Sequence, residues 1–388
     1  MGERYTFLDE YVIVEDSSLF GKEKFYKLCN ETDNKYIKIP TEKVNYVKQV
    51  IELLDGKHTL DEIENEIFLK KGIRMDVKTL VQLFKQNGFI KEETLSTEKN
   101  EIDLLTKEVI GFTPKLKNQS IYLMCKKIKM LAAILYSMGF VIGIAIITFH
   151  ARNLLHNSYD MYHFQKVGAV MIALYISLGL HELSHVVVAL AFEKPIARIS
   201  FNLYLGCLPM IYLRIRGINS LQVRKRIQVI LAGITTNFFL AVIFLAMTSL
   251  QLGGEKGNEL LWIIGISNLF AGLLNFIPFT LTDGYFALSI LMNRYDMRNF
   301  LWKGGFLNCN SFQMKKSERR IYIIYASLSV LSLVYIVCSF VRWIVNVYKR
   351  CVVLYEKIGI ILLLLFVIYC ILQVVFNLFG LRRQRKRN

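Results

Sequence analysis

The sequence predicts a polytopic α-helical membrane protein with six transmembrane helices, preceded by a winged-helix-like α+β soluble domain. Of 388 residues, 54% are hydrophobic and 20% are charged, whereas soluble domains average about 45–50% and about 25%. Basic residues exceed acidic ones by 48 − 31 = 17. This excess belongs to the apolar part, because residues 1–100 hold 16 basic and 19 acidic residues and the rest hold 32 and 12. Basic residues beside apolar runs are typical of membrane flanks.

Residues 1–95 have the pattern of a small soluble domain. Short strands are expected at Tyr11–Glu15 and Lys35–Ile39, where apolar residues alternate or cluster. A helix follows from about Glu42 to Leu54 and is stopped by Asp55-Gly56. Strands followed by short helices suggest a winged-helix-like module.

Two further helices of this domain have recognisable ends. Thr59 and Glu62 are spaced as a capping box at the start of one helix. Asp76 can cap the next helix, and Gly88 can close it. Residues 96–128 are polar and mixed, which predicts a linker to a membrane domain at 129–388.

Six apolar runs dominate the remainder, and they are uncharged except for a histidine–glutamate cluster in the second. Each holds about 20 residues or more, enough at 1.5 Å per residue to cross a hydrocarbon core of about 30 Å. The runs are Met130–Phe149, Val167–Phe192, Ile227–Leu250, Leu260–Leu281, Ile321–Val341 and Ile358–Leu381.

The basic residues predict the orientation of these spans. With the N-terminus in the cytosol, the cytosolic segments 193–226, 282–320 and 382–388 hold 7 + 7 + 5 = 19 basic residues, and the opposite loops hold 7. Short cytosolic loops are enriched in lysine and arginine. We therefore expect a multi-pass protein of the cell membrane with both termini in the cytosol.

The second apolar run contains the ionisable sequence His181-Glu182-Leu183-Ser184-His185. Ionisable residues within a membrane span are costly and usually functional. On a helix the two histidines lie one turn apart on one face, where they can bind one Zn²⁺. Such an ion lowers the pKa of a coordinated water to about 7, and Glu182 can accept the proton. The structural alternative is a pair of core histidines beside a buried acid.

A catalytic zinc site needs a third protein ligand and an open position. Among the acidic residues after His185, Asp283 lies directly against an apolar run at a matching depth. Pro278 breaks the helix before it, so the backbone can unwind and aim the carboxylate. The alternative for Asp283 is a helix cap.

These two segments resemble the site-2 protease family of intramembrane zinc metalloproteases, which carries HExxH on one span and N-x-x-P-x-x-x-x-D-G on a later one. Asn275, Pro278, Asp283 and Gly284 have that spacing. The resemblance covers about residues 165–290. It implies that His181, His185 and Asp283 bind one zinc ion and that Glu182 is the general base.

Other segments match the same family. Residues 232–237 (AGITTN) resemble its A-G-P-x-x-N element, which implies that Asn237 steadies the peptide carbonyl or oxyanion. Asn275 is a substrate-binding candidate by its family position. The alternative for Asn237 is an interhelical hydrogen bond. Ile234 replaces the usual proline, and Tyr285 replaces a second glycine.

Residues 197–213 alternate and lie where the family has a β-hairpin that dips into the membrane and presents an edge to substrate. An extended edge can hold an unwound peptide by strand addition. The alternative is a plain amphipathic loop.

The N-terminal domain resembles the PqqD-like fold in residues 51–63 and 80–90, which share an "L-L-D-G…L-x-x-x-G-F-I" pattern. This fold recognises the leaders of ribosomally made, modified peptides by adding the leader to a sheet edge. A net charge of −3 over residues 1–100 argues against binding of nucleic acid. A generic winged-helix docking domain is the alternative.

Together the two resemblances imply a zinc-dependent intramembrane endopeptidase that matures a precursor peptide near the cytosolic face, with an ABC-type exporter as a candidate partner. One rival interpretation is regulated intramembrane proteolysis of a membrane-anchored signalling protein. Another is a non-catalytic leader-peptide receptor or export partner, which would not need Glu182.

Overall fold

The chain folds into two compact units. The computed structural model describes residues 3–17, 24–31, 35–72, 76–91, 106–114, 118–152, 164–204, 208–279, 282–292, 316–350, 353–362, 364–366, 368–369 and 372. The first unit consists of Met1–Glu98 with two later segments, Glu193–Ala197 and Arg214–Ile227, and the second unit holds the rest of the chain. The first unit is thus larger than the domain expected at 1–95.

The first unit contains two small antiparallel sheets. Strands β2 (Tyr11–Ser17), β3 (Lys24–Asn30) and β4 (Tyr36–Pro40) form a three-stranded meander with β3 in the centre. Strands β1 (Arg4–Thr6) and β5 (Asp55–Thr59) form the second sheet. The expected strands correspond to β2 and β4, and β1, β3 and β5 are additional.

The three predicted helices of this unit are present, and the predicted caps of α2 and α3 are formed. A 3₁₀ turn, η1 (Thr41–Lys43), leads into α1 (Val44–Leu53). At the start of α2 (Leu60–Lys71), both hydrogen bonds of the Thr59–Glu62 capping box are present. The Asp76 carboxylate accepts from the Thr79 N–H at 2.9 Å and caps α3 (Val77–Gln86), which is followed by Gly88 at φ 72°.

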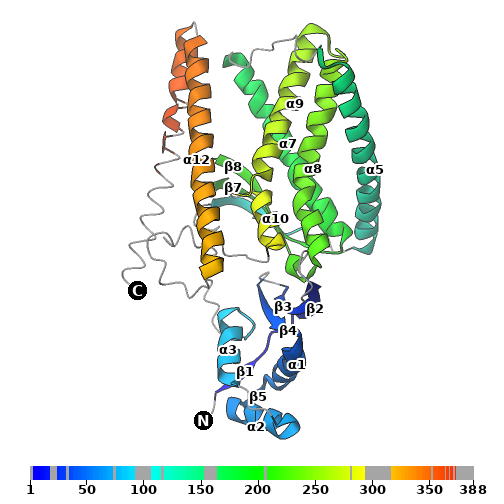
Figure 1. Ribbon diagram of the computed structural model, residues 1–388, viewed down its shortest axis with the longest axis vertical. Helices are drawn as coiled ribbons and strands as arrows, with labels where there is room; N and C mark the ends of the chain where they lie inside the picture. Colours follow the sequence, from blue (N-terminus) through cyan, green and yellow to red (C-terminus); the bar gives the residue numbers. More distant parts are fainter. Residues whose placement is uncertain are drawn as a thin grey trace. The chain divides into compact units, whose positions relative to one another are not determined.

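One face of the β2–β3–β4 sheet packs with α1, α2 and α3 around an apolar core (Figure 1). Phe7, Phe84 and Phe89 meet in its centre, with ring centroids 5.2 to 6.3 Å apart. The other buried members are Leu28, Ile39, Val44, Val47, Val50, Ile51, Leu54, Leu60, Ile63, Ile67, Val77, Val81 and Ile90.

The second unit is built on long apolar helices, and five helices in the described part of the chain are long and apolar enough to cross a membrane. They are α5 (Gln119–Phe149), α7 (Phe164–Ala191), α8 (Val223–Ser249), α9 (Gly254–Phe276) and α12 (Lys316–Arg350). These helices correspond to the first five apolar runs. Figure 1 shows α5, α8 and α9 side by side, and glycines at their contacts allow close approach.

Most of the sixth expected span, Ile358–Leu381, lies outside the described residues. Residues 354–362 are helical, and Ile360 packs there against Ile344 and Val347 of α12.

A three-stranded sheet accompanies the helices of the second unit. Strands β7 (Ile196–Tyr204) and β8 (Leu208–Ile215) correspond to the hairpin expected at 197–213. The third strand, β6 (Thr106–Phe112), pairs antiparallel with β7 and lies in the stretch expected to be a linker. Residues 96–128 are therefore not a plain linker. They contain both β6 and the first residues of α5. Arg198 and Glu108 form an ion pair between β7 and β6.

A break between α9 and α10 (Asp283–Leu291) positions Asp283 at a helix start. Helix α9 ends at Phe276, two residues before Pro278, which cannot continue the helical hydrogen bonding. A Cβ atom on Gly284 would collide with the Phe276 carbonyl. Only glycine therefore fits where α10 approaches the end of α9.

Candidate metal centre

Helix α7 carries both histidines of the HExxH sequence on one face. The His181 and His185 rings are buried, with 3% and 8% of each residue exposed, and their centroids are 4.9 Å apart. The four-residue spacing advances the helix by about one turn, so both Nε2 atoms point to the same side. These two atoms are 3.2 Å apart.

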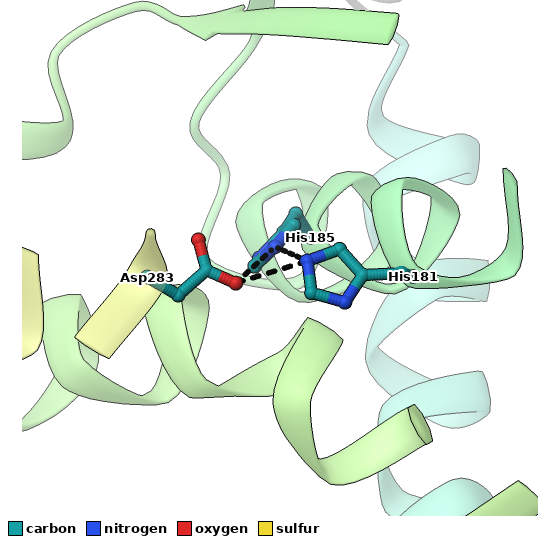
Figure 2. Close-up of side chains that lie close together, drawn as sticks. All are labelled: His181, His185 and Asp283. Atoms are coloured by element: carbon teal, nitrogen blue, oxygen red, sulfur yellow. Dashed lines mark hydrogen bonds and ion pairs between the residues drawn. The ribbon is translucent and has the colours of Figure 1, made fainter. Parts of the chain in front are cut away.

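The third member comes from the start of α10. Asp283 Oδ2 lies 2.9 Å from His181 Nε2 and 3.2 Å from His185 Nε2 (Figure 2). The three residues are a group of potential metal ligands whose donor atoms lie close together. The structure thus brings together the three residues predicted as ligands.

The triangle of donor atoms has the size of one face of a zinc tetrahedron. Zinc bonds to nitrogen and oxygen of about 2.0–2.1 Å at the tetrahedral angle separate the ligand atoms by about 3.3 Å. The three observed separations are 2.9 to 3.2 Å. Asp283 Oδ2 is also buried and makes no well-directed hydrogen bond. A cation between the three atoms would satisfy it, so the donor set fits zinc.

The backbone of α8 holds the second ring nitrogen of His185. The Nδ1 atom of His185 lies 2.7 Å from the carbonyl oxygen of Val229. Since a carbonyl only accepts, Nδ1 carries the proton and Nε2 keeps its lone pair toward Asp283. Metal-binding histidines commonly have such an outer partner, which fixes the tautomer and the ring orientation.

Asn237 can perform the same task for His181. Its Nδ2 atom lies 3.1 Å from His181 Nδ1, and its Oδ1 atom is buried without a hydrogen-bond partner. A half turn of the amide about χ2 exchanges its two ends, so that Oδ1 accepts from the protonated Nδ1. That arrangement leaves His181 Nε2 free to act as a ligand. The contact is an interhelical hydrogen bond between α8 and α7.

Gly233 allows α8 to approach the His181 ring. A Cβ atom built on Gly233 would overlap Cε1, Nε2 and Cδ2 of the imidazole. The ring therefore lies flat against the α8 backbone at this point. Val229 and Gly233 were not predicted as site residues, although both stand at four-residue intervals before Asn237 and so share its helix face.

The remaining predicted residues are less tightly held. Glu182 follows His181 on α7 and is half-buried, and its side chain makes no hydrogen bond within the described part of the chain. Asn275 is half-buried near the end of α9, and its side chain makes no hydrogen bond to any described residue. The Asn275 carbonyl, in contrast, lies close to Gly284, so this residue borders the turn that carries Asp283.

Ile234 and Tyr285, the two residues that depart from the site-2 protease pattern, are both buried in helix contacts. Ile234 is buried, and α8 continues through it as one helix from Val223 to Ser249. Tyr285 is buried against α12, with its ring centroid 5.9 Å from that of Tyr325. It therefore takes part in an aromatic cluster with Tyr322 and Tyr325 that packs α10 onto α12.

Comparisons with protein-family models, curated proteins and solved structures found no match to this chain. We therefore infer the function from the geometry of His181, His185 and Asp283 and from the residues that orient them.

Proposed function

We propose that the protein is a zinc-dependent intramembrane endopeptidase of the site-2 protease type, which cleaves a ribosomally made precursor peptide near the cytosolic membrane face. The convergence of His181, His185 and Asp283 supports this most strongly, because three buried donor atoms form one face of a tetrahedron. A purely structural zinc site is closed by four protein ligands. In the described part of the chain, only these three residues form such a group.

Zn²⁺ bound there would supply Lewis-acid chemistry, polarising the scissile carbonyl and acidifying a water molecule. Glu182 would accept the proton of the attacking water and pass it to the leaving amine. It suits this task because it is half-buried beside the ligands and is not committed to another hydrogen bond among the described residues. Asn237 would orient His181. We also propose that Asn237 steadies the oxyanion and that Asn275 binds substrate.

We further propose that the N-terminal sheet and helices form the winged-helix-like, PqqD-like module that captures the leader. The β2–β3–β4 meander supports this, because among the described strands β2 and β4 each pair on one side only. An extended peptide can add to such an edge through main-chain hydrogen bonds. Pro40 at the end of β4 is typical of an edge strand. Capture would raise the local concentration of the precursor at the metal centre.

Six spans with cytosolic termini complete the proposal. The bias of lysine and arginine toward the segments assigned to the cytosol supports this orientation. It would put the leader-binding module on the side of the membrane where precursor peptides are made. The cleaved product would then pass to an exporter, for which an ABC-type transporter is the proposed partner.

The test compares peptides in the medium and in membranes from cells that make wild type, Glu182→Gln or the control Glu42→Gln, an exposed acid in η1. We expect one short peptide to vanish from the medium of Glu182→Gln cells while its longer precursor accumulates. Accumulation of a single-span protein instead would favour the signalling interpretation. No difference between Glu182→Gln and Glu42→Gln would contradict proteolysis and favour a leader-peptide receptor.

A further inference from the structure

The second face of the β2–β3–β4 sheet buries an ionic cluster. Asp16 and Lys27 lie on neighbouring strands, away from the apolar core, and are only 6% and 0% exposed. Arg226, in the first turn of α8, is 1% exposed. Charged side chains are almost never this deeply buried unless they are paired.

Asp16 is the centre of this cluster. Its Oδ2 atom accepts from Arg226 Nη2 at 2.8 Å and also forms an ion pair with Lys27 Nζ. Two cations therefore share one carboxylate. Beside them, the Cys29 thiol donates to the carbonyl oxygen of Asn219 at 3.5 Å. All these residues belong to the first unit, so the segment Arg214–Ile227 covers this face of the sheet.

Arg226 shares a face of α8 with the residues that orient the metal ligands. Arg226, Val229, Gly233 and Asn237 are spaced three or four residues apart and so lie along one side of the helix, which we call the α8 contact face. Val229 binds His185, and both Gly233 and Asn237 contact His181. A rotation or shift of α8 that releases Arg226 would move all three of these contacts.

We propose that Asp16 is a positioning residue for the metal centre. It holds Arg226 within the first unit, which also contains Glu193–Ala197 just after α7, and it thereby fixes the start of α8 relative to the end of α7. The inference rests on the proposed metal site and deepens it. It gives the Asp16–Arg226 ion pair a role in the geometry of the helix that contacts both histidines. Asp16 itself touches neither ligand nor substrate.

The test is Co²⁺ binding to the purified full-length protein, followed by the visible absorption of the bound ion. The central variant is Asp16→Asn, which keeps the shape of the side chain. Because loss of an outer partner typically weakens metal affinity about 10–100-fold, we expect at least about a tenfold loss and an altered spectrum. His181→Ala should abolish the signal, which shows that the ion occupies this site.

Three further variants separate positioning from general damage to the sheet. Glu10→Gln removes an ion pair to Arg216, a residue of the same covering segment that lies outside α8. Lys27→Met removes one of the two cations from this buried face of the sheet but leaves Asp16 paired with Arg226. Both should bind Co²⁺ as the wild type does. The exchange Asp16→Arg with Arg226→Asp keeps two cations and one carboxylate and should restore affinity.

Each outcome has a defined meaning. Equal Co²⁺ affinity in Asp16→Asn and Glu10→Gln would overturn the positioning role. A loss in Lys27→Met as large as in Asp16→Asn would also overturn it, and so would failure of the charge exchange to restore binding. If the wild type binds no Co²⁺ at all, the proposed metal site itself is wrong and the inference falls with it.

Discussion

Replacement of Gly233 by alanine tests the metal centre where α8 lies against His181. The added Cβ atom would lie 2.6 Å from His181 Cδ2 and closer still to Cε1 and Nε2. Carbon atoms in contact are normally about 3.5–4.0 Å apart, so the imidazole must move by about 1 Å. Ligand distances in metal sites hold to about 0.2 Å. A ring displaced this far can no longer act as a ligand.

The expected loss of affinity can be separated from loss of stability. Disturbing an outer partner of a metal ligand costs about 10–100-fold in affinity, and removing a ligand costs more. We therefore expect Gly233→Ala to weaken metal binding at least about 100-fold, or about 2.7 kcal/mol. Overpacking costs about 1–3 kcal/mol of folding free energy. Alanine favours the helix by up to about 1 kcal/mol relative to glycine, which offsets part of this loss of folding free energy. The fold should survive.

Gly179→Ala is the matched control, because Gly179 lies on the same helix as His181 and a Cβ atom added there would meet nothing within 4 Å. Titration of the apo-protein with Zn²⁺ in competition with a chelator measures both affinities. Wild-type affinity in Gly233→Ala would refute the argument, since it would mean that His181 is not a ligand at the position that the structure gives it.

Three more predictions concern Glu182, Thr59 and Lys27. Glu182→Gln should keep wild-type metal affinity but lose about 10²–10⁴-fold in peptide cleavage, measured on the accumulated precursor; normal cleavage would exclude it as the base. Thr59→Ala should destabilise α2 by about 1 kcal/mol, seen as faster amide exchange in that helix of the full-length protein, with α3 unchanged. Burial is the main reason why the pKa of Lys27 is lowered to about 8, and the nearby charge of Arg226 is the second reason, while Asp16 acts in the opposite direction. Between pH 8 and 10.5 the unfolded state therefore binds more protons than the folded state, so the free energy of unfolding should rise by about 3 kcal/mol across that window. Lys27→Met should lack this rise. If the free energy of unfolding had the same pH dependence in both proteins, the burial argument would be contradicted.

Features with a local physical cause could be predicted from the sequence. The capping box of Thr59 and Glu62 satisfies backbone groups within four residues, so its pattern specifies the start of α2. Pro278 ends α9 for a similarly local reason. The two histidines could be identified because ionisable residues contrast sharply with an apolar run. Asp283 could be identified by its spacing from Asn275 and Pro278, which resembles the site-2 protease pattern.

Features that depend on distant partners could not be predicted in this way. Strand β6 lies in a predicted linker because Lys107 and Glu108 hide the apolar pattern of Val109, Ile110 and Phe112. Its pairing with β7 joins segments about 90 residues apart in sequence. The support of His185 by the Val229 carbonyl is equally hidden, because a backbone acceptor leaves no signature in the residue type.

The ionic cluster is the clearest example of a feature that composition conceals. Division of the chain by hydropathy assigns Asp16 and Lys27 to a soluble domain and Arg226 to a membrane flank, where each charge is ordinary. The structure buries all three in one unit. Buried ion pairs contribute little net stability, since desolvation offsets the attraction, yet removal of one partner costs about 3–5 kcal/mol. Such a cluster favours one arrangement over alternatives more than it stabilises the fold. In this protein the favoured arrangement is the one in which Arg226 pairs with Asp16. The same arrangement places the α8 contact face against both histidines.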